Sequence, residues 1–206
     1  MKRILILIHV LFCGYICPLL AEDTGAARYQ DSILKVADAL PATLVRLTYL
    51  RDMAYKYQYA PYNMTCSPRL YEEARRQKNA FYENMGAYYL AACYDKKHDP
   101  DSLSYWVDVL KDFVSQVGTY DYYLEQKAAI SRALASKRQI EKAVYVAKET
   151  LEESKLRHSN NGMIAAYNSL GCAYGVASRP NEALDSFLEA YRNFSPHTKA
   201  SLQVDI

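Results

Sequence analysis

The sequence predicts an all-α protein, an α-α superhelix (solenoid) of antiparallel helical hairpins. Only 7 Gly and 7 Pro occur among 206 residues, and this scarcity of turn-forming residues favours helices over a turn-rich β protein. Apolar residues recur with a period of about 3.6 residues, and no segment shows the alternation of a half-buried strand bounded by hairpin turns. A hairpin-sized pattern of small and bulky residues also recurs, and such an internal repeat is typical of a solenoid.

Residues 1–21 have the pattern of a secretory signal peptide. Lys2 and Arg3 form a short positive start, a short apolar run follows, and Ala21 supplies a small residue at the cleavage position. We therefore expect an exported protein of the periplasm or cell envelope, with residues 22–206 as its helical repeat domain. An uncleaved segment that serves as a membrane anchor is the alternative.

Helix-breaking residues divide the remainder of the chain into predicted helices. With the helical period, they place helices at roughly 28–39, 42–58, 68–77, 80–95, 101–117, 121–136, 139–157, 162–177 and 180–193. Paired in order, the helices form repeats at about 42–77, 79–117, 121–157 and 162–197. Leu202 and Val204 would begin a further helix, so we expect the repeat domain to continue beyond Ile206.

The clearest repeat runs from Ile164 to Pro196. Its packing residues are Tyr167, Leu170, Gly171, Tyr174, Ala183, Phe187 and Ala190. Gly171 and Ala183 are small enough for two antiparallel helices to approach closely, and the bulky side chains fill the space around that contact. A weaker form of the pattern lies 40 residues earlier, at Ile130-Ser131, Leu134, Ala143 and Ala147, and another lies 45 residues before that, at Met85-Gly86 and Tyr89.

The 164–196 pattern closely resembles the tetratricopeptide repeat, with its final Pro displaced by one position. The segments 167–174, 181–184 and 82–94, together with the export signal, resemble the exported sensor region of Bacteroidetes tetratricopeptide proteins. The resemblance implies a non-enzymatic scaffold that binds a protein or peptide, as the sensory or interaction region of a signal-transduction protein. It also implies a possible membrane-anchored output domain, C-terminal to this segment.

In the tetratricopeptide family, the first helix of each repeat lines a concave groove. The matching positions are Ala165, Asn168, Cys172, Gly175 and Val176 in the last repeat; Glu125, Ala128, Arg132, Ala135 and Ser136 in the middle one; and Ala80, Glu83, Ala87, Leu90 and Ala91 in the earlier one. Of these, Glu83, Glu125, Arg132 and Asn168 are the candidate ligand contacts, because Asn can hydrogen-bond a peptide backbone and Arg can pair with a carboxylate. The alternative is that they are ordinary polar residues on a helix surface. The Tyr clusters are likewise open to two interpretations, binding surface or packing between helices.

Charge and motifs favour a protein-binding role over other classes. Of the 25 Lys and Arg, two lie in the signal, which leaves 23 basic residues against 23 Asp and Glu. Such a neutral chain lacks the electrostatic footprint of a nucleic-acid-binding protein. Neither the four His nor the widely spaced Cys66, Cys93 and Cys172 show a metal-ligand spacing, and phosphate-loop and nucleophile motifs are absent. We therefore expect no enzyme, cofactor or metal.

A glycan-binding outer-membrane protein with tetratricopeptide-like helices is the alternative function. In that case Trp106 and neighbouring Tyr residues would form the platform for a sugar ring. The residues before Cys13 and Cys17 are bulky where a lipoprotein signal favours small ones, so the sequence gives this alternative less support.

Overall fold

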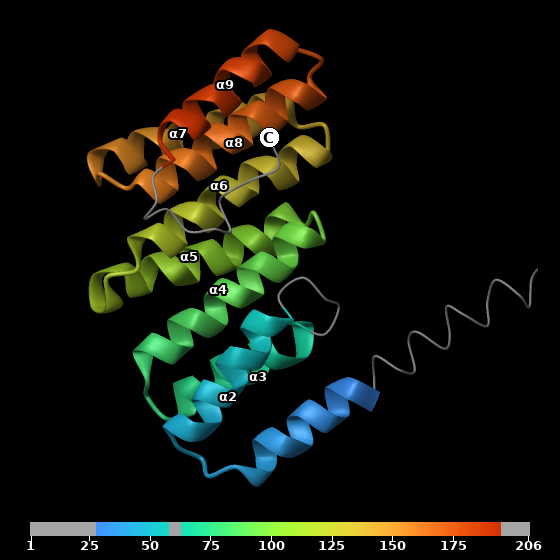
Figure 1. Cartoon of the computed structure of the whole chain (residues 1–206), viewed down its shortest axis with the longest axis vertical. Helices are drawn as coiled ribbons and strands as arrows, with labels where there is room; N and C mark the ends of the chain where they lie inside the picture. Colours follow the sequence, from blue (N-terminus) through green and yellow to red (C-terminus); the bar gives the residue numbers. More distant parts are fainter. Residues whose placement is uncertain (1–27, 58–62, 195–206) are drawn as a thin grey trace, which may run out of the picture.

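A computed structural model describes residues 28–57 and 63–194, and all regular structure within them is helical. The helices are residues 28–39, α2 (Leu44–Lys56), α3 (Asn63–Arg76), α4 (Ala80–Lys96), α5 (Pro100–Val117), α6 (Tyr120–Ser136), α7 (Ile140–Leu156), α8 (Asn160–Val176) and α9 (Pro180–Arg192). They stack in chain order along one axis, from residues 28–39 at the bottom of Figure 1 to α9 at its top. The predicted all-α superhelical solenoid is confirmed.

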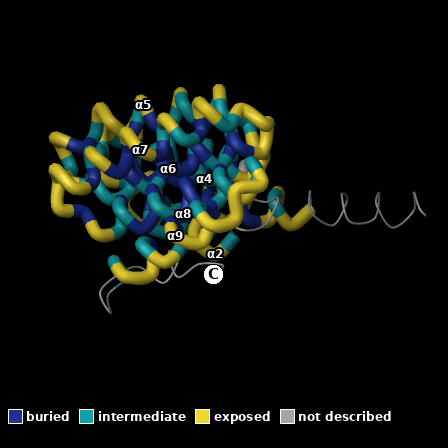
Figure 2. The backbone as a smooth tube through the Cα atoms, turned by 90° about the horizontal axis from the view of Figure 1, so that it is seen from above, coloured by how far each residue is buried: buried dark blue, intermediate teal, exposed yellow. Residues whose placement is uncertain are grey.

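The stack has two kinds of helix. The inner helices α2, α4, α6 and α8 each contact the next inner helix as well as their neighbours in the chain. The outer helices α3, α5, α7 and α9 pack on inner helices and make no close backbone contact with one another in the described residues. Buried residues consequently gather along α4, α6 and α8 (Figure 2). Small residues such as Ala128, Ala133 and Ala173 are fully buried there, and they allow the inner helices to approach closely.

Most successive helices are joined by the same three-residue turn. Its middle residue has a left-handed backbone, at Lys78, His98, Arg138, His158 and Ser178, and Gly118, the first of the two residues between α5 and α6, continues this 20-residue spacing. At Arg138, the turn is closed when the N–H of Gln139 donates to the Leu134 carbonyl at 3.0 Å and the N–H of Arg138 donates to the Ala135 carbonyl at 2.9 Å. This pair of bonds is a Schellman motif, which satisfies carbonyls at a helix end.

The last residue of several turns also caps the helix that follows. Ser159 Oγ accepts the Gly162 N–H at 2.9 Å, and Asp99 Oδ1 accepts the Ser102 N–H at 3.2 Å. One residue thus ends one helix and begins the next, which keeps the connections short and fixes the angle between helices. The sequence placed the start of α8 at 162, whereas capping by Ser159 starts it at Asn160.

The repeat is 40 residues long throughout α4–α9. The inner helices begin at Ala80, Tyr120 and Asn160, and the outer ones begin at Pro100, Ile140 and Pro180. The residues equivalent to Ile130-Ser131 are therefore Leu90-Ala91, and the predicted 45-residue spacing from Met85-Gly86 does not describe this stack.

Another difference from the sequence prediction concerns Pro68. It lies inside α3, which begins at Asn63, five residues before the predicted start at 68. Pro68 is the sixth residue of α3, beyond the first turn, so it removes one backbone hydrogen bond within the helix, and α3 continues despite this loss.

Gly171 and Gly86 each mark a close approach between two helices. A Cβ added at Gly171 would lie 2.5 Å from the Phe187 ring of α9, and one at Gly86 would lie 2.7 Å from the Tyr71 backbone of α3. Of the other predicted packing residues, Tyr167, Leu170 and Tyr174 belong to the α7–α8 contact around Ala147 and Ala166, and Tyr89, Ala143, Ala183 and Ala190 are buried. Gly86 therefore serves the α3–α4 contact, whereas Gly171 serves the α8–α9 contact.

Candidate functional site

The inner helices carry a line of polar side chains that we call the inner strip: Tyr88 and Asp95 on α4, Glu125 and Arg132 on α6, and Asn168 on α8. Residues seven apart lie on the same face of a helix, so each helix aligns its own pair. Contacts between α4, α6 and α8 bring these faces together. The strip contains three of the four candidate ligand contacts.

Arg132 connects three inner helices. Its Nη2 lies 2.8 Å from Asp95 Oδ2 on α4, and its Nη1 donates to Ser169 Oγ on α8 at 3.2 Å. Ser169 Oγ in turn donates to the Ala128 carbonyl of α6 at 2.9 Å. Burial by itself would lower the pKa of the Arg132 guanidinium, but the charge of Asp95 and its hydrogen bond more than offset this, and the pKa rises. Arg132 therefore stays charged and fixes the spacing of the helices.

Glu125 is held by a buried tyrosine. The Tyr88 hydroxyl donates to Glu125 Oε1 at 2.9 Å, and the Tyr88 ring lies 4.9 Å from the ring of Tyr122, measured between centroids. Burial, followed by the charge of Glu125, raises the pKa of Tyr88 well above its ordinary value. Tyr88 thus remains a protonated donor, and the half-exposed Glu125 keeps a fixed position on the strip.

Asn168 is buried, with 6% of its surface exposed. Its Oδ1 has no hydrogen-bond partner among the described residues. A buried amide oxygen without a partner keeps unused acceptor capacity and destabilises the free protein. The oxygen atom is itself buried, so a donor on a ligand would gain from it only if the Asn168 side chain turned toward the surface.

Glu83 lies apart from the strip. It is placed beside Arg75 and Tyr71 of α3; burial raises the pKa of its carboxyl, and the charge of Arg75 opposes this shift. In the 40-residue repeat its equivalents are Tyr123 and Met163, whereas the predicted groove positions matched Glu83 with Ala128 and Asn168. The groove position was carried to Glu83 through the 45-residue spacing, and this is why it falls on a different face.

Many of the other expected groove positions are contacts between helices. Those that are buried are Ala87, Leu90, Ala91, Ala128, Ala135 and Ala165. Those that keep partial or full exposure are Ala80, Ser136, Cys172, Gly175 and Val176. The sequence reasoning missed Asp95 as the partner of Arg132; the signal is that the two residues occupy neighbouring inner-face positions of successive 40-residue repeats.

The aromatic residues divide between packing and surface. Tyr88, Tyr89 and Tyr123 are buried, whereas Tyr105 and Tyr145 are 62% and 68% exposed. Trp106 is half-buried, and its ring stands edge-on to Tyr71 at 5.1 Å and to Tyr105 at 5.2 Å between centroids.

The described part of the chain lacks the features of a metal site and of a membrane span. It holds no group of three His, Cys, Asp or Glu side chains placed to bind a metal ion. None of its helices combines the length and apolar character needed to span a bilayer. The predicted signal at residues 1–21 and the predicted continuation after 197 lie outside the described residues.

No known family model, curated protein or solved structure matches the chain. Interpretation of the site therefore depends on its geometry.

Proposed function

We propose that the chain is a non-enzymatic scaffold that binds a polypeptide along the inner strip. The observation that carries the proposal is the arrangement of Glu125, Arg132 and Asn168 on helices whose spacing is set by the Arg132 network. An acidic group, a basic group and an amide oxygen held at fixed separations can recognise the charges and backbone donors of an extended peptide.

Rigid positioning supports this role. Arg132 is tied to α4 and α8, and Glu125 is tied to Tyr88, so few side-chain rotamers must be ordered when a ligand binds. Arg132 and Asp95 are 31% and 22% exposed, so an acidic side chain of the ligand can approach the guanidinium from the solvent side.

The wider role follows from the resemblance to exported tetratricopeptide proteins. We place the scaffold outside the cytoplasm, in the periplasm or cell envelope, as the sensory or interaction region of a signal-transduction protein. In this proposal ligand binding changes the curvature of the stack, and a C-terminal output domain reads that change. The resemblance to tetratricopeptide repeats is strongest in α8 and α9.

The test is selection of peptides from a random display library, followed by measurement of their affinity for variants. Glu125→Gln should weaken a strip-binding peptide about five-fold or more, since it removes one charge contact. Glu152→Gln is the matched control, because this carboxylate lies on outer helix α7 with a side chain 72% exposed. Equal binding to wild type and to a Glu125→Gln, Asn168→Ala double variant would contradict the proposal.

Arg132 needs a separate comparison because it also stabilises the stack. Asp95→Asn leaves Arg132 charged and releases it from its ion pair. If Arg132 contacts an acidic group of the ligand, Asp95→Asn should tighten binding while Arg132→Gln weakens it. If both variants change stability alone and leave affinity unchanged, Arg132 is a structural residue only.

The glycan-binding alternative has less support from the geometry. A sugar platform needs an exposed aromatic face, whereas Trp106 is half-buried between two edge-on rings. Retention on an immobilised glycan panel that is lost in Trp106→Leu would favour it over the peptide scaffold.

A further inference from the structure

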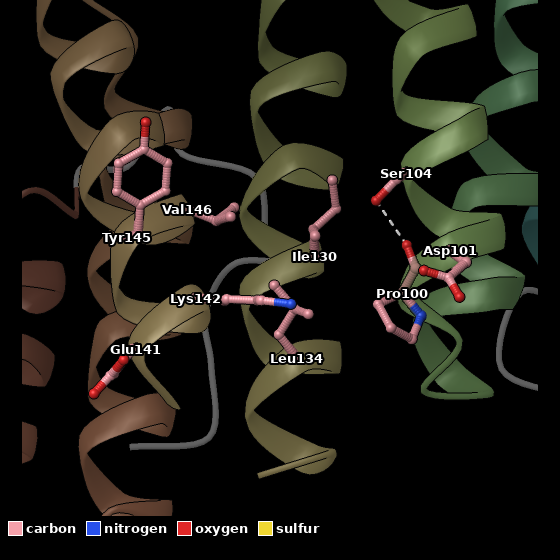
Figure 3. A pocket seen from close by; sticks show the side chains of 9 residues that line it. All are labelled: Pro100, Asp101, Ser104, Ile130, Leu134, Glu141, Lys142, Tyr145 and Val146. Carbon is pink, nitrogen blue, oxygen red and sulfur yellow. Dashed lines mark hydrogen bonds between the residues drawn. The ribbon is translucent and has the colours of Figure 1, made fainter. Parts of the chain in front are cut away.

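A pocket of about 450 Å³ opens between the outer helices α5 and α7, above α6 (Figure 3). It is lined by Pro100, Asp101, Ser104, Ile130, Leu134, Glu141, Lys142, Tyr145 and Val146. Ile130, Leu134 and Val146 supply an apolar floor, and the charged residues stand at its edge. Ile130 and Leu134 lie about half a turn away from Arg132 around α6, so this pocket and the inner strip are on opposite sides of the helix.

The 40-residue repeat explains why a pocket forms here. In the 40-residue repeat, the residues equivalent to Leu134 are Tyr94 on α4 and Tyr174 on α8. Tyr174 is partly buried and packs against the apolar cluster that α7 and α8 form around Ala147 and Leu170. The floor position one turn earlier, Ile130, is aliphatic in all three repeats. The middle repeat therefore has the aliphatic floor residue, Ile130, but it has Leu134 where the adjacent repeats have a tyrosine ring.

Each of the two neighbouring rings lies under a cation. Lys97 Nζ is 5.5 Å from the centre of the Tyr94 ring, and the Arg179 guanidinium is 4.7 Å from the centre of the Tyr174 ring. In the middle repeat Lys142 lines the pocket and extends from α7 toward α6 (Figure 3). Lys142 has no ion-pair partner within residues 28–57 and 63–194. Its ammonium group is thus available to a ring placed over Leu134.

We propose that this pocket binds an aromatic side chain, Tyr or Phe, of a partner polypeptide. The guest ring takes the place that Tyr94 and Tyr174 fill in the adjacent repeats, rests on Ile130 and Leu134, and receives the Lys142 cation on its face. Asp101 at the edge can accept a hydrogen bond from a tyrosine hydroxyl, which favours Tyr over Phe.

The surroundings favour a polypeptide over a free aromatic molecule. Tyr105 and Tyr145 occupy the same position of successive repeats, on α5 and α7, and are 62% and 68% exposed. Exposed tyrosines offer rigid, amphipathic contact area of the kind that protein-binding surfaces use. This site goes beyond the proposed function of the inner strip, and either site can fail without the other.

The test is a titration of the folded protein with N-acetyl-tyrosinamide, with N-acetyl-leucinamide as the control, followed by NMR of the methyl groups. Saturable shifts are expected at Ile130, Leu134 and Val146, with affinity about five-fold higher for the tyrosine derivative. Shifts confined to other methyl groups, or equal affinity for the two probes, would overturn the proposal.

Variants that copy the neighbouring repeats supply the decisive comparison. Leu134→Tyr introduces the ring found in those repeats, and Val146→Trp introduces the residue that α5 has at the equivalent position, Trp106. Both should fill the pocket and weaken binding about ten-fold or more, with unchanged helix content as a check on folding. Lys142→Gln should weaken binding about three-fold, while Lys148→Gln, outside the pocket on the same helix, should not.

The source of the ring is settled by one more probe. If p-cresol binds more tightly than N-acetyl-tyrosinamide, the pocket is a site for a free phenol, and the polypeptide assignment is overturned. Wild-type affinity in both Leu134→Tyr and Val146→Trp would place the probe elsewhere and overturn the site itself.

Discussion

Three glycines on the inner helices test how closely the stack is packed, because the same Gly→Ala change meets three different surroundings. At Gly175 an added Cβ has nothing within 4 Å. At Gly171 it meets the side-chain ring of Phe187 at 2.5 Å, and at Gly86 it meets the Tyr71 Cα and N atoms, both at 2.7 Å. Side-chain atoms can move aside, whereas the Tyr71 backbone belongs to a packed helix.

These contacts set the expected energies. Alanine gains about 1 kcal/mol over glycine from helix propensity, and somewhat less in a last turn, so Gly175→Ala should stabilise the protein by about 0.5–1 kcal/mol. Overpacking against backbone costs about 1–3 kcal/mol or more. Because the Tyr71 backbone atoms lie only 2.7 Å away, Gly86→Ala should meet the upper part of that cost, about 2–3 kcal/mol, and the propensity gain then leaves a net destabilisation of about 1–2 kcal/mol. Gly171→Ala should fall between the two, because the Phe187 ring can shift.

The assay is urea denaturation followed by circular dichroism, with the free energy of unfolding compared among the three variants and wild type. The expected order of stability is Gly175→Ala, wild type, Gly171→Ala and Gly86→Ala. A Gly86→Ala protein as stable as wild type would refute the close α3–α4 approach, and a destabilised Gly175→Ala protein would refute the account of helix propensity.

Three further predictions concern the turns, the thiols and the ion pair. His158→Gly should raise the free energy of unfolding by about 1 kcal/mol, and Gly118→Ala should lower it by about as much, because a side chain is strained at a left-handed position; urea denaturation measures both. Burial raises the pKa of the Cys66 and Cys93 thiols to about 11, above their ordinary value of 9.0. Between these two pH values both thiols stay protonated in the folded protein, whereas the same thiols ionise in the unfolded chain. Their contribution to stability is therefore complete below pH 9 and is lost as the pH rises toward 11, and mass spectrometry should show slower alkylation at pH 9 for these two thiols than for the more exposed Cys172. A double-mutant cycle of Asp95→Ala and Arg132→Ala should give a coupling energy of about 1 kcal/mol that falls with added salt; zero coupling would mean that the pair does not tie α4 to α6.

The sequence was sufficient to predict the helices because periodicity and breakers act locally. Pro100, Pro180 and Gly118 stand at helix ends as expected. Pro68 misled the prediction, because α3 continues through it despite the loss of one backbone hydrogen bond. The left-handed turns at Arg138 and His158 carry no glycine signal, so they became visible only when the backbone was known.

The candidate site was harder to predict because it depends on register between helices. The 40-residue spacing in the last two repeats placed Glu125 and Arg132 on one face of α6. The prediction matched Met85-Gly86 to Ile130-Ser131, but position 86 needs a glycine because the Tyr71 backbone of α3 lies against it. The spacing was therefore five residues too long, and Glu83 was assigned to the wrong face of α4. Burial of Asn168 and the partnership of Arg132 with Asp95 arise from contacts between repeats, which one repeat considered alone does not contain.

The uniform turn also affects how the protein would respond to tension. Each 40-residue hairpin contacts only its neighbours, so a pull on the two ends should detach hairpins one at a time, starting from an end. Each release would lengthen the chain by about 130–145 Å of extended backbone. A helical stack with such evenly spaced steps would absorb a sudden load and would shorten again once the load is removed.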